Sequence, residues 1–429
     1  MKAFFLKIAV LGVLMVTAVS AHGQELFENG VRWKSIPRDY TQTVSLVVFV
    51  KGGLFRETFK NNGVGALFAR TWLKSGNLME KVEFVGGAVH AGLSSDFFEF
   101  SLSVASDSLD AVLSELTEQF LSPRFSQTVF EREKDLLLRE LEAEKDDPNS
   151  IAYRLFMEAT YKKHPYSMRT EGAVRSITGI KFKDVKSYYS KNFYASDMIV
   201  SFVGNYTDEQ EKRAREIFKR VKKGNSLRID CSGADIVKSE RLEAADPRIQ
   251  QAKMFLAYGA PSAGSAEYVY SKVLSDFLGG GMSSPYFTEL RKEKGYAYAV
   301  SVIFPSRLCS SRMIGYIGLQ IENVDDAISV MQRINNSVAD TITDAELEKS
   351  KNHIIGQLLS DLETNSRKAW YAAFFENLGL GFDHTDRYIS MLRAVKKEDV
   401  AKVSEMFKKP RTIFIYKPEE NGDKNEIVR

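Results

Sequence analysis

Cysteine and histidine are both scarce in this chain of 429 residues. Only two cysteines occur, Cys231 and Cys309, and both lie in the second half of the sequence. They permit one disulfide in an oxidising compartment, but they exclude a disulfide scaffold and a zinc knuckle. The five histidines are dispersed, and no two of them are spaced four apart on one helix: His22, His90, His164, His353 and His384.

A strong charge of either sign is also lacking. The 59 basic and 56 acidic residues give a formal net charge of +3, and no dense basic block stands out. This balance gives no indication of a nucleic-acid partner. The hydrophobic fraction of 44% and the charged fraction of 27% are typical of a globular protein without a large disordered region. The length is sufficient for two or more domains.

Long apolar runs are absent beyond the N-terminus, so we expect no transmembrane segment in the mature chain. The N-terminus itself carries Lys2 and Lys7, then an apolar run from Ile8 to Val19, then small residues that end at Ala21. That run is short for a membrane span and ends at an acceptable signal-peptidase site. We therefore predict a secretory signal peptide over 1–21 and export of the mature chain to a bacterial periplasm. An uncleaved membrane anchor is the alternative.

Strand and helix patterns interleave along the first half of the chain. β-Branched residues fill TVSLVVFVKGG from Thr43, and FFEFSLSVAS from Phe97 alternates as a strand does. DSLDAVLSELTEQFLS has helical periodicity, and TVFEREKDLLLRELEAEK opens with Thr128 and Glu131 at the spacing of a capping box. These segments predict one compact unit of about 200 residues, a size common for a domain.

The second half of the chain repeats the first. Asp110-Ala111-Val112 recurs as Asp326-Ala327-Ile328, and Phe130 in the following helix corresponds to Leu347 at nearly the same offset. A second Thr-x-x-Glu motif, Thr343 to Glu346, again precedes that helix. Similar order and similar offset together indicate an internal duplication.

Turn formers and charges interrupt the periodic segments between Lys222 and Pro247. The sequence therefore predicts an N-terminal domain over 22–225 and a linker over 226–247. A C-terminal domain over 248–420 and a tail over 421–429 follow.

Several motifs carry a family resemblance through their order along the chain. A strand, a glycine pair and a helix after Gly63 precede ER…LLLRELEAEKDDP, HPYS, FYASDMIVSFVGN and FLGGGMSSPYFTELRKEKGYAYAV. The series resembles the insulinase/pitrilysin family of zinc metallopeptidases, and within it the processing-peptidase-like subunits with two homologous domains. The resemblance covers nearly the whole mature chain. It implies an α+β fold of two homologous domains, each a mostly antiparallel β-sheet packed with α-helices, which form half of a chamber.

Active members of this family carry His-x-x-Glu-His on the helix after that glycine. Residues four apart share a helix face, so two imidazoles bind one zinc ion while the intervening Glu takes a proton from zinc-bound water. By the resemblance, the three motif positions here are Ala66, Ala69 and Arg70, and the distal zinc-binding Glu is Glu140. The alanines offer no donor atoms and Arg70 brings a positive charge, so we expect no metal on this chain.

The altered helix keeps an apolar stripe on which it can pack, formed by Val64, Leu67, Phe68 and Trp72. We expect Ala66, Ala69 and Arg70 on the opposite face. Arg70 either places charge on the cleft face or pairs with Glu140 as a salt bridge in place of the metal. Otherwise Glu140 is a solvated acid on a highly charged helix.

The second half retains residues that match the family's Arg and Tyr pair, namely Arg291 and Tyr298 in LRKEKGYAYAV. The resemblance implies that these two side chains reach the carbonyl region of the substrate. A guanidinium and a phenol can both donate to a developing oxyanion. The alternative is a surface cation at a helix end beside a strand tyrosine.

Two further segments are candidates for substrate binding. His90 in GGAVHAG stands where the family usually has Asn, beside the strand that receives substrate, although a solvent-facing histidine is an equal alternative. Gly279, Gly280 and Gly281 in LGGGMSSP either border the substrate path or form a tight helix entrance.

In the two-chain branch of the family, one subunit supplies zinc and the other supplies the Arg and Tyr pair across a chamber. This chain is accordingly predicted to be a non-catalytic subunit of an exported heterodimeric zinc metallopeptidase. It would be inactive alone, and the zinc would be on a homologous partner that shares the peptide substrate. The alternative is a non-hydrolytic peptide-binding or scaffold protein that pairs extended peptides with a sheet edge near AVHAGLSSD. A third reading, a peptidase with other ligands of its own, lacks candidate ligands.

Overall fold

The computed structural model describes residues 24–419. The predicted signal peptide over 1–21 and the predicted tail over 421–429 lie outside the described residues. Within residues 24–419, no helix is both long enough and apolar enough to cross a bilayer.

The first half of the chain forms a six-stranded sheet with the strand order β1-β2-β6-β3-β5-β4. Its strands are β1 (Gln24–Leu26), β2 (Arg32–Pro37), β3 (Thr43–Lys51), β4 (Ala88–Leu93), β5 (Phe97–Ala105) and β6 (Met198–Gly204). Strands β2 and β6 run parallel, and the other neighbours run antiparallel. β4 is therefore an edge strand with one side unpaired.

Eight α-helices belong to the same half within the described residues. They are α1 (Val64–Ser75), α2 (Leu78–Phe84), α3 (Leu109–Leu121), α4 (Gln127–Ala143), α5 (Pro148–Tyr161), α6 (Val174–Gly179), α7 (Phe182–Asn192) and α8 (Asp208–Lys219). Side chains of α1, α3, α4, α7 and α8 form a common core with one face of the first sheet.

The second half forms a five-stranded sheet with the order β7-β11-β8-β10-β9. Its strands are β7 (Glu240–Asp246), β8 (Ala252–Ala260), β9 (Ala299–Ile303), β10 (Ser311–Leu319) and β11 (Arg411–Pro418). Its helices are α9 (Glu267–Gly279), α10 (Val324–Thr341), α11 (Asp344–Asp361), α12 (Asn365–Asn377), α13 (His384–Ala394) and α14 (Lys397–Ser404). A π-helical turn, η6, spans Phe287–Glu293.

Apart from the additional strand β1, the two sheets share one topology, which agrees with the duplication in the sequence. Each contains one parallel pair, β2 with β6 and β7 with β11, and is otherwise antiparallel. The α+β fold of two sheets packed with helices is thus confirmed. Strand β7 falls inside the range 226–247 that was predicted as a linker, so regular sheet structure begins earlier than expected.

Each central strand is buried on both faces, which explains its almost continuous apolar sequence. In β3, Val44, Leu46, Val48 and Val50 face the helices of the first half. Val47 and Phe49 point the other way, into a core that contains Ala369 and Ala372 of α12. The second half thus supplies the helix that covers the inner face of the first sheet.

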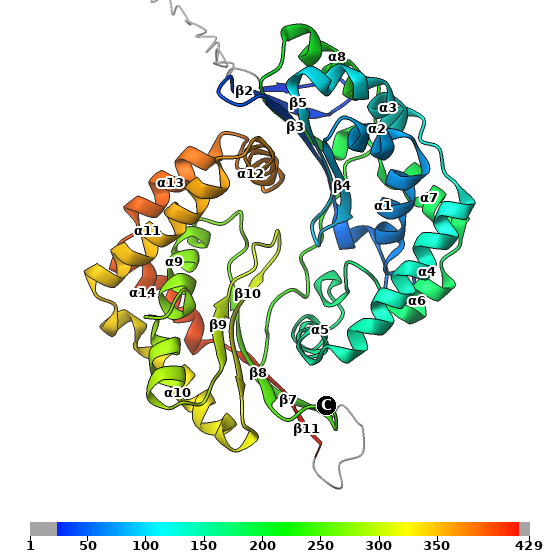
Figure 1. The fold of residues 1–429 in the computed structure, drawn as a ribbon. Helices are drawn as coiled ribbons and strands as arrows, with labels where there is room; N and C mark the ends of the chain where they lie inside the picture. The colour runs from blue at the N-terminus through cyan, green and yellow to red at the C-terminus, as the bar shows by residue number, and fades with distance from the viewer. Residues whose placement is uncertain (1–23, 420–429) are drawn as a thin grey trace, which may run out of the picture.

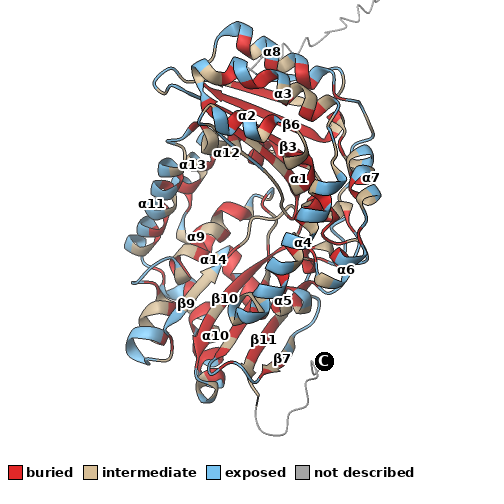
Figure 2. Cartoon of the chain, turned by 45° about the vertical axis from the view of Figure 1, so that its right-hand side comes forward, coloured by how far each residue is buried: buried red, intermediate tan, exposed pale blue. Residues whose placement is uncertain are grey.

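The first half likewise supplies a helix, α5, that covers the second sheet. Ala152 and Phe156 of α5 pack against Phe255 of β8 and Phe414 of β11. In Figure 1, α12 lies beside β3 and α5 lies beside the second sheet. Figure 2 shows the central strands of both sheets largely as buried and the edge strand β9 as intermediate, whereas exposed residues are found mainly on the outer helices. The two halves are therefore joined by shared cores rather than by a linker alone.

The two predicted capping boxes had different outcomes. Thr343 caps α11, and its side chain and that of Glu346 exchange hydrogen bonds with each other's backbone N–H, as predicted. The box at Thr128 and Glu131 was wrong, because α4 begins two residues earlier and Ser126 accepts the hydrogen bond from the Val129 N–H. A serine two residues before the threonine is an equally good N-cap by residue type.

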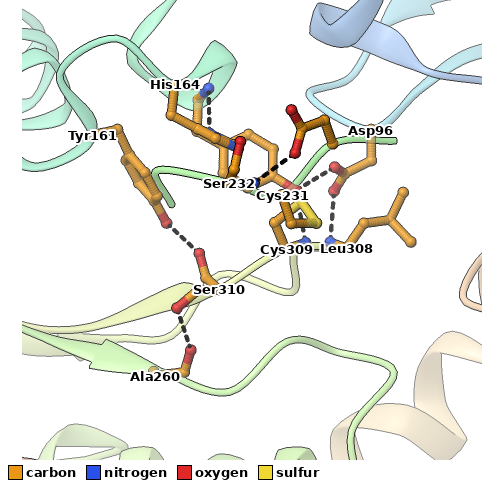
Figure 3. Close-up of a disulfide and its surroundings, with 11 residues drawn as sticks. Asp96, Tyr161, His164, Cys231, Ser232, Ala260, Leu308, Cys309 and Ser310 are labelled. Atoms are coloured by element: carbon orange, nitrogen blue, oxygen red, sulfur yellow. Dashed lines mark hydrogen bonds between the residues drawn. A yellow bond between two sulfur atoms is a disulfide. The ribbon is translucent and has the colours of Figure 1, made fainter. Parts of the chain in front are cut away.

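Cys231 and Cys309 form a disulfide, which settles the pairing that the sequence left open. The bond joins the segment before β7 to the turn before β10, next to a contact between the two halves (Figure 3). There the Tyr166 hydroxyl donates to Asp96 at 2.5 Å and accepts from the Cys309 N–H at 3.1 Å. The disulfide thus anchors both cysteine segments beside hydrogen bonds that link the halves.

Candidate functional site

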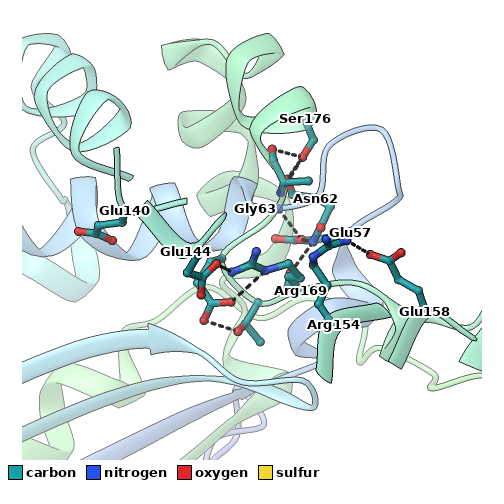
Figure 4. A network of polar contacts seen from close by, with 12 residues as sticks. Glu57, Asn62, Gly63, Glu140, Glu144, Arg154, Glu158, Arg169 and Ser176 are labelled. Atoms are coloured by element: carbon teal, nitrogen blue, oxygen red, sulfur yellow. Dashed lines mark hydrogen bonds and ion pairs between the residues drawn. The ribbon is translucent and has the colours of Figure 1, made fainter. Parts of the chain in front are cut away.

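Helix α1 is positioned by a tight turn and by a buried acid. Its N-cap, Gly63, has φ 95°, and a Cβ there would lie 2.3 Å from a methyl carbon of Ile177. The Glu57 carboxylate accepts hydrogen bonds from the N–H groups of Gly63 at 2.8 Å and Gly65 at 2.7 Å, and from the Asn62 amide (Figure 4). Burial raises the pKa of Glu57 to about 7, although these three donors act in the opposite direction. The start of α1 is therefore fixed by groups outside the helix.

The packing face of α1 is as predicted, but it is wider than predicted. Val64, Leu67, Phe68 and Trp72 are all at most 3% exposed. Ala69 is also buried, at 1% exposure, so its placement on the opposite face was wrong. The sheet and the neighbouring helices enclose α1 on most sides, so a stripe of four residues underestimates the buried arc.

The residues of α1 that are not fully buried include Ala66, Arg70 and Lys74, which are spaced four apart and so share one face. Arg70 and Lys74 make ion pairs with two glutamates of α4, which lie seven positions apart along that helix. Lys74 Nζ lies 2.7 Å from an oxygen of Glu133, whose side chain is almost completely buried. Paired charges therefore line the contact between α1 and α4.

Arg70 and Glu140 form the second of these pairs, as one hypothesis from the sequence proposed. Nη1 and Nη2 of Arg70 donate to Oε1 and Oε2 of Glu140 at 3.0 and 2.5 Å. The Arg70 hydrogen bond lowers the pKa of the Glu140 carboxyl, and Glu140 in turn raises the pKa of Arg70. The guanidinium thus engages both oxygens of the one carboxylate that matches a zinc ligand.

These residues do not fit a catalytic zinc ion. Such a site needs three protein ligands and one open position, whereas Ala66 and Ala69 carry no donor atom. Glu140 is already bound to a cation. Within residues 24–419, no group of three His, Cys, Asp or Glu side chains is arranged to hold a metal ion. The polar face of α1 therefore holds a paired cation rather than a set of zinc ligands.

The structure also brings Arg291 and Tyr298 together. Arg291 lies in η6, and its guanidinium carbon is 5.4 Å from the ring centroid of Tyr298 and 4.9 Å from that of Phe287. Tyr298 is 84% exposed. Among the described residues, no hydrogen bond or ion pair engages the guanidinium of Arg291. Both groups can therefore donate hydrogen bonds to a molecule that reaches them.

The other predicted substrate-binding residues lie in two separate places. His90 is an exposed residue on the edge strand β4. At the end of α9, a Cβ on Gly279 would lie 2.4 Å from the backbone nitrogen of Val302, so close packing of α9 on β9 accounts for this glycine. Gly280 is similarly close to Asp276, whereas Gly281 faces open space. The substrate-binding role of these four residues stays a prediction.

Sequence reasoning missed Glu57 and the pair of Lys74 with Glu133. Glu57 precedes the helix it caps by more than one turn, so no capping motif covers it. Lys74 could have been found, because it follows Arg70 by four residues and shares its helix face.

Two family descriptions match consecutive parts of this chain. Residues 35–174 match the family described as Insulinase (Peptidase family M16), and residues 179–354 match the Peptidase M16 inactive domain. Together these matches cover most of both halves.

Among curated proteins, the chain is 26% identical over 384 residues to the uncharacterized zinc protease YmxG of Bacillus subtilis, covering 87% of this chain and 92% of that protein. It is 22% identical over 428 residues to the non-peptidase homolog YmxG of Helicobacter pylori, covering 95% of each. The relatives of this chain thus include a protein described as a zinc protease and one described as a non-peptidase homolog.

Solved structures share the fold. A peptidase M16 inactive domain from Pseudomonas fluorescens has a TM-score of 0.84 at 18% identity, covering 94% of this chain and 99% of that one. A protease from Helicobacter pylori has a TM-score of 0.83 at 21% identity, covering 92% and 99%. A chain of complex III from Candida albicans has a TM-score of 0.76 at 15% identity, covering 94% and 97%.

Proposed function

Because this chain belongs to the insulinase family, peptidase family M16, we propose that it is the non-catalytic subunit of an exported heterodimeric zinc metallopeptidase. One asymmetry carries the proposal. In the first half, Arg70 engages the only carboxylate that matches a zinc ligand, whereas in the second half Arg291, beside the exposed Tyr298, has no hydrogen-bonding partner within residues 24–419. Arg70 and Glu140, at zinc-motif positions, are thus engaged in an ion pair, whereas Arg291 and Tyr298 are available to a ligand.

Arg291 and Tyr298 would act on a peptide bond that the partner subunit hydrolyses. A zinc ion held by the partner would activate the water that attacks the carbonyl carbon, and negative charge would then develop on the carbonyl oxygen. The Arg291 guanidinium and the Tyr298 hydroxyl would donate hydrogen bonds to that oxygen, which stabilises the charge most strongly in the transition state. The contribution of this chain is thus electrostatic, and the partner supplies the proton transfers.

The same subunit would help to hold the peptide. Strand β4 has one unpaired edge, and an extended peptide can add to such an edge through main-chain hydrogen bonds. His90 on that strand would then lie beside the peptide, and the loop around Gly280 and Gly281 would border its path. Recognition of main-chain groups needs no metal on this chain.

Export to the periplasm is part of the proposal. The predicted signal peptide supports it, and so does the pairing of Cys231 with Cys309, because disulfides persist in oxidising compartments.

The second candidate function is a non-hydrolytic peptide-binding or scaffold protein with the same fold. The free edge of β4 favours it, since strand addition alone would suffice. The description of the Helicobacter pylori relative as a non-peptidase homolog agrees with either function.

The two functions differ in whether a zinc-bearing homologue is needed. If an adjacent reading frame encodes a similar chain with His-x-x-Glu-His, the two chains should be produced together and purified through a tag on this chain alone. The proposal predicts co-purification and peptide cleavage by the pair, with no cleavage by either chain alone. Full activity of the zinc-bearing chain by itself would instead favour the scaffold function.

A further inference from the structure

A cavity of about 450 Å³ lies where the two halves meet. The turn before β5 contributes Asp96 to its lining, and the second half contributes residues of α9, α11, α12 and the segment after β9. The volume lies within the range of small-ligand pockets, about 300 to 1,000 Å³. Of the residues at this cavity, Gly280 was singled out from the sequence, and Ser94 and Asp96 belong to the segment AVHAGLSSD that was predicted to pair with peptides.

The three carboxylates that line this cavity all have partners. Asp96 accepts from the Tyr166 hydroxyl and, at 3.3 Å, from the Leu308 N–H. Asp276 hydrogen-bonds His353 at 2.7 Å. Asp361 pairs with Arg367, which also lines the cavity, at 2.7 Å. The acidic side of the cavity is therefore satisfied within the protein.

Lys272 is not satisfied in the same way. Its ammonium donates to the Phe304 carbonyl at 3.0 Å and lies beside the rings of Tyr268 and Phe304, 5.4 and 5.2 Å from their centroids, which are 5.6 Å apart. Among the described residues, no carboxylate forms an ion pair with it. Burial in these surroundings lowers the pKa of Lys272 to about 8. An anionic group of a ligand would therefore stabilise the charged form of Lys272.

Arg307 is the second cation without a carboxylate contact. Its guanidinium carbon stacks 4.7 Å from the centroid of Tyr166, and its buried Nε has no hydrogen-bond acceptor in the part of the chain that the structure describes. Its charge lowers the pKa of the Asp96 carboxyl, which burial otherwise raises, but no ion pair joins the two side chains. The three acidic and three basic side chains that line the cavity balance in number, but Lys272 and Arg307 are the two of its cations that form no ion pair among the described residues.

The remaining walls are largely aromatic. Phe97 stacks on Phe49 at 3.8 Å and Trp370 stacks on Phe374 at 5.0 Å, and Phe97 and Trp370 meet edge to face at 6.4 Å, so these rings form one packed aromatic wall. A packed aromatic wall favours a flat or branched apolar group of a ligand.

We propose that this cavity is a binding site for a carboxylate attached to an apolar or aromatic group, such as the C-terminus of a short peptide. The carboxylate binds between Lys272 and Arg307 through charge-assisted hydrogen bonds, and the apolar group packs against Phe97 and Trp370. A monoanion suits the cavity better than a phosphate, because three carboxylates already line it and repel further negative charge. The assignment concerns this chain alone, so it stands or fails separately from the function in trans.

Isothermal titration of the mature chain tests the proposal with three probes. These are N-acetyl-Ala-Phe as the free acid, the same dipeptide as its C-terminal amide, and 3-phenylpropionate. We expect the acid to bind at least about tenfold more tightly than the amide, since only the acid carries the charge. Equal binding of 3-phenylpropionate and the peptide acid would identify a free carboxylate as the source, whereas tighter binding of the peptide would identify a peptide terminus. Equal affinity for acid and amide, or no binding of either acid, would overturn the proposal.

Variants locate the site within the chain. Lys272→Met and Arg307→Gln should each weaken binding of the acid at least about tenfold and leave binding of the amide unchanged. Lys60→Met is the matched control, because Lys60 is exposed in the other half and should leave both affinities unchanged. Lys272→Met removes an unpaired charge, so its thermal midpoint should not fall. Unchanged affinity in both cavity variants would contradict the assignment.

Tryptophan fluorescence gives a second readout that does not depend on the charged variants. Of the three tryptophans, Trp33 and Trp72 are buried in the core of the first half, and only Trp370 lines the cavity. The acid should change the emission of the wild type but not that of Trp370→Phe. A response that persists in Trp370→Phe would place the ligand elsewhere.

Discussion

The guanidinium of Arg70 faces the carboxylate of Glu140 through two parallel hydrogen bonds of 3.0 and 2.5 Å. Arg70 is on α1 and Glu140 is on α4, so the pair spans the two helices that hold zinc in active members of the family. The packing of α1 needs neither residue, since its apolar side chains are buried on the other faces. Helix α1 thus packs as in the family fold, while Arg70 on its polar face forms an ion pair with Glu140.

If this chain differs from active family members only in the side chains at the zinc-motif positions, substitutions at those positions should create a metal site. We expect the double variant Ala66→His and Arg70→His to bind one zinc ion per chain, with Glu140 as the third ligand. Metal analysis after dialysis measures this directly, and the wild-type chain should carry no stoichiometric zinc. Adding Glu140→Gln to the double variant should lower the affinity at least about tenfold. A double variant that binds no zinc would show that α1 and α4 no longer stand at ligand distance.

The Arg70 and Glu140 pair should contribute little to stability. Glu140 is 56% exposed at its side chain, so solvent screens the interaction. A double-mutant cycle of Arg70→Ala and Glu140→Ala in urea should give a coupling free energy of at most about 1 kcal/mol. Lys74→Met should destabilise more, by about 1–3 kcal/mol, because it leaves the buried Glu133 with only Arg132 as a partner. A larger effect for Arg70 than for Lys74 would contradict this ranking.

His164 should make the fold sensitive to acid. The side chain is buried, its Nδ1 accepts from the Tyr166 N–H at 3.2 Å, and its Nε2 has no hydrogen-bond partner between residues 24 and 419. Burial lowers the pKa of His164 from 6.5 to about 4, so the unfolded chain takes up a proton at a higher pH than the folded chain does. The stability that this group contributes is complete above pH 6.5 and is lost as the pH falls to about 4, by about 3 kcal/mol.

His164→Asn isolates this effect, because asparagine keeps an acceptor for the Tyr166 N–H and does not titrate. The variant should lose less stability than the wild type between pH 6.5 and pH 4 in urea denaturation. Only the difference between the two curves is informative. Glu57, whose pKa is raised to about 7, contributes the opposite slope in the same window, since its stability is lost as the pH rises. Parallel curves would show that His164 does not titrate in this range.

The disulfide should stabilise the chain measurably. Cys231 and Cys309 are separated by 78 positions, and closing a loop of that length restricts the unfolded chain. Cys231→Ser with Cys309→Ser should lower the free energy of unfolding by about 2–4 kcal/mol. Reductant should lower the thermal midpoint of the wild type and leave that of the double variant unchanged. Equal midpoints for the two proteins in oxidising buffer would contradict the expectation.

The sequence predicted those features that depend on local periodicity or on motif order. The apolar stripe of α1, strand β3 and the repeat of α3 as α10 were correct, because a period of two or of 3.6 is visible within a dozen residues. Arg70 and Glu140 could be paired as a hypothesis only because the resemblance aligned both with one lost site. The two-domain α+β fold was predicted from the same family resemblance.

The features that the sequence did not predict depend on contacts made far along the chain. Ala69 is buried by elements that its own helix does not reveal. The pairing of Cys231 with Cys309 and the unpaired charge of Lys272 arise where the two halves meet. Lys272 did carry a local signal, since it follows Tyr268 by four residues and precedes the buried Val273 on a largely apolar helix. A lysine on an apolar helix face indicates a buried charge, which is unusual unless a partner or a ligand compensates it.

Turnover by the assembled pair of chains tests the proposed function most directly. The zinc-bearing partner should be combined with the wild-type chain, with Arg291→Ala and Tyr298→Phe together, and with the control Arg393→Ala, whose exposed arginine makes no ion pair among the described residues. We predict that the double variant still co-purifies with the partner but that kcat falls about 100-fold or more, as for lost oxyanion donors, while the control is unchanged. Unchanged kcat in the double variant would contradict the proposal that this chain completes its partner's active site.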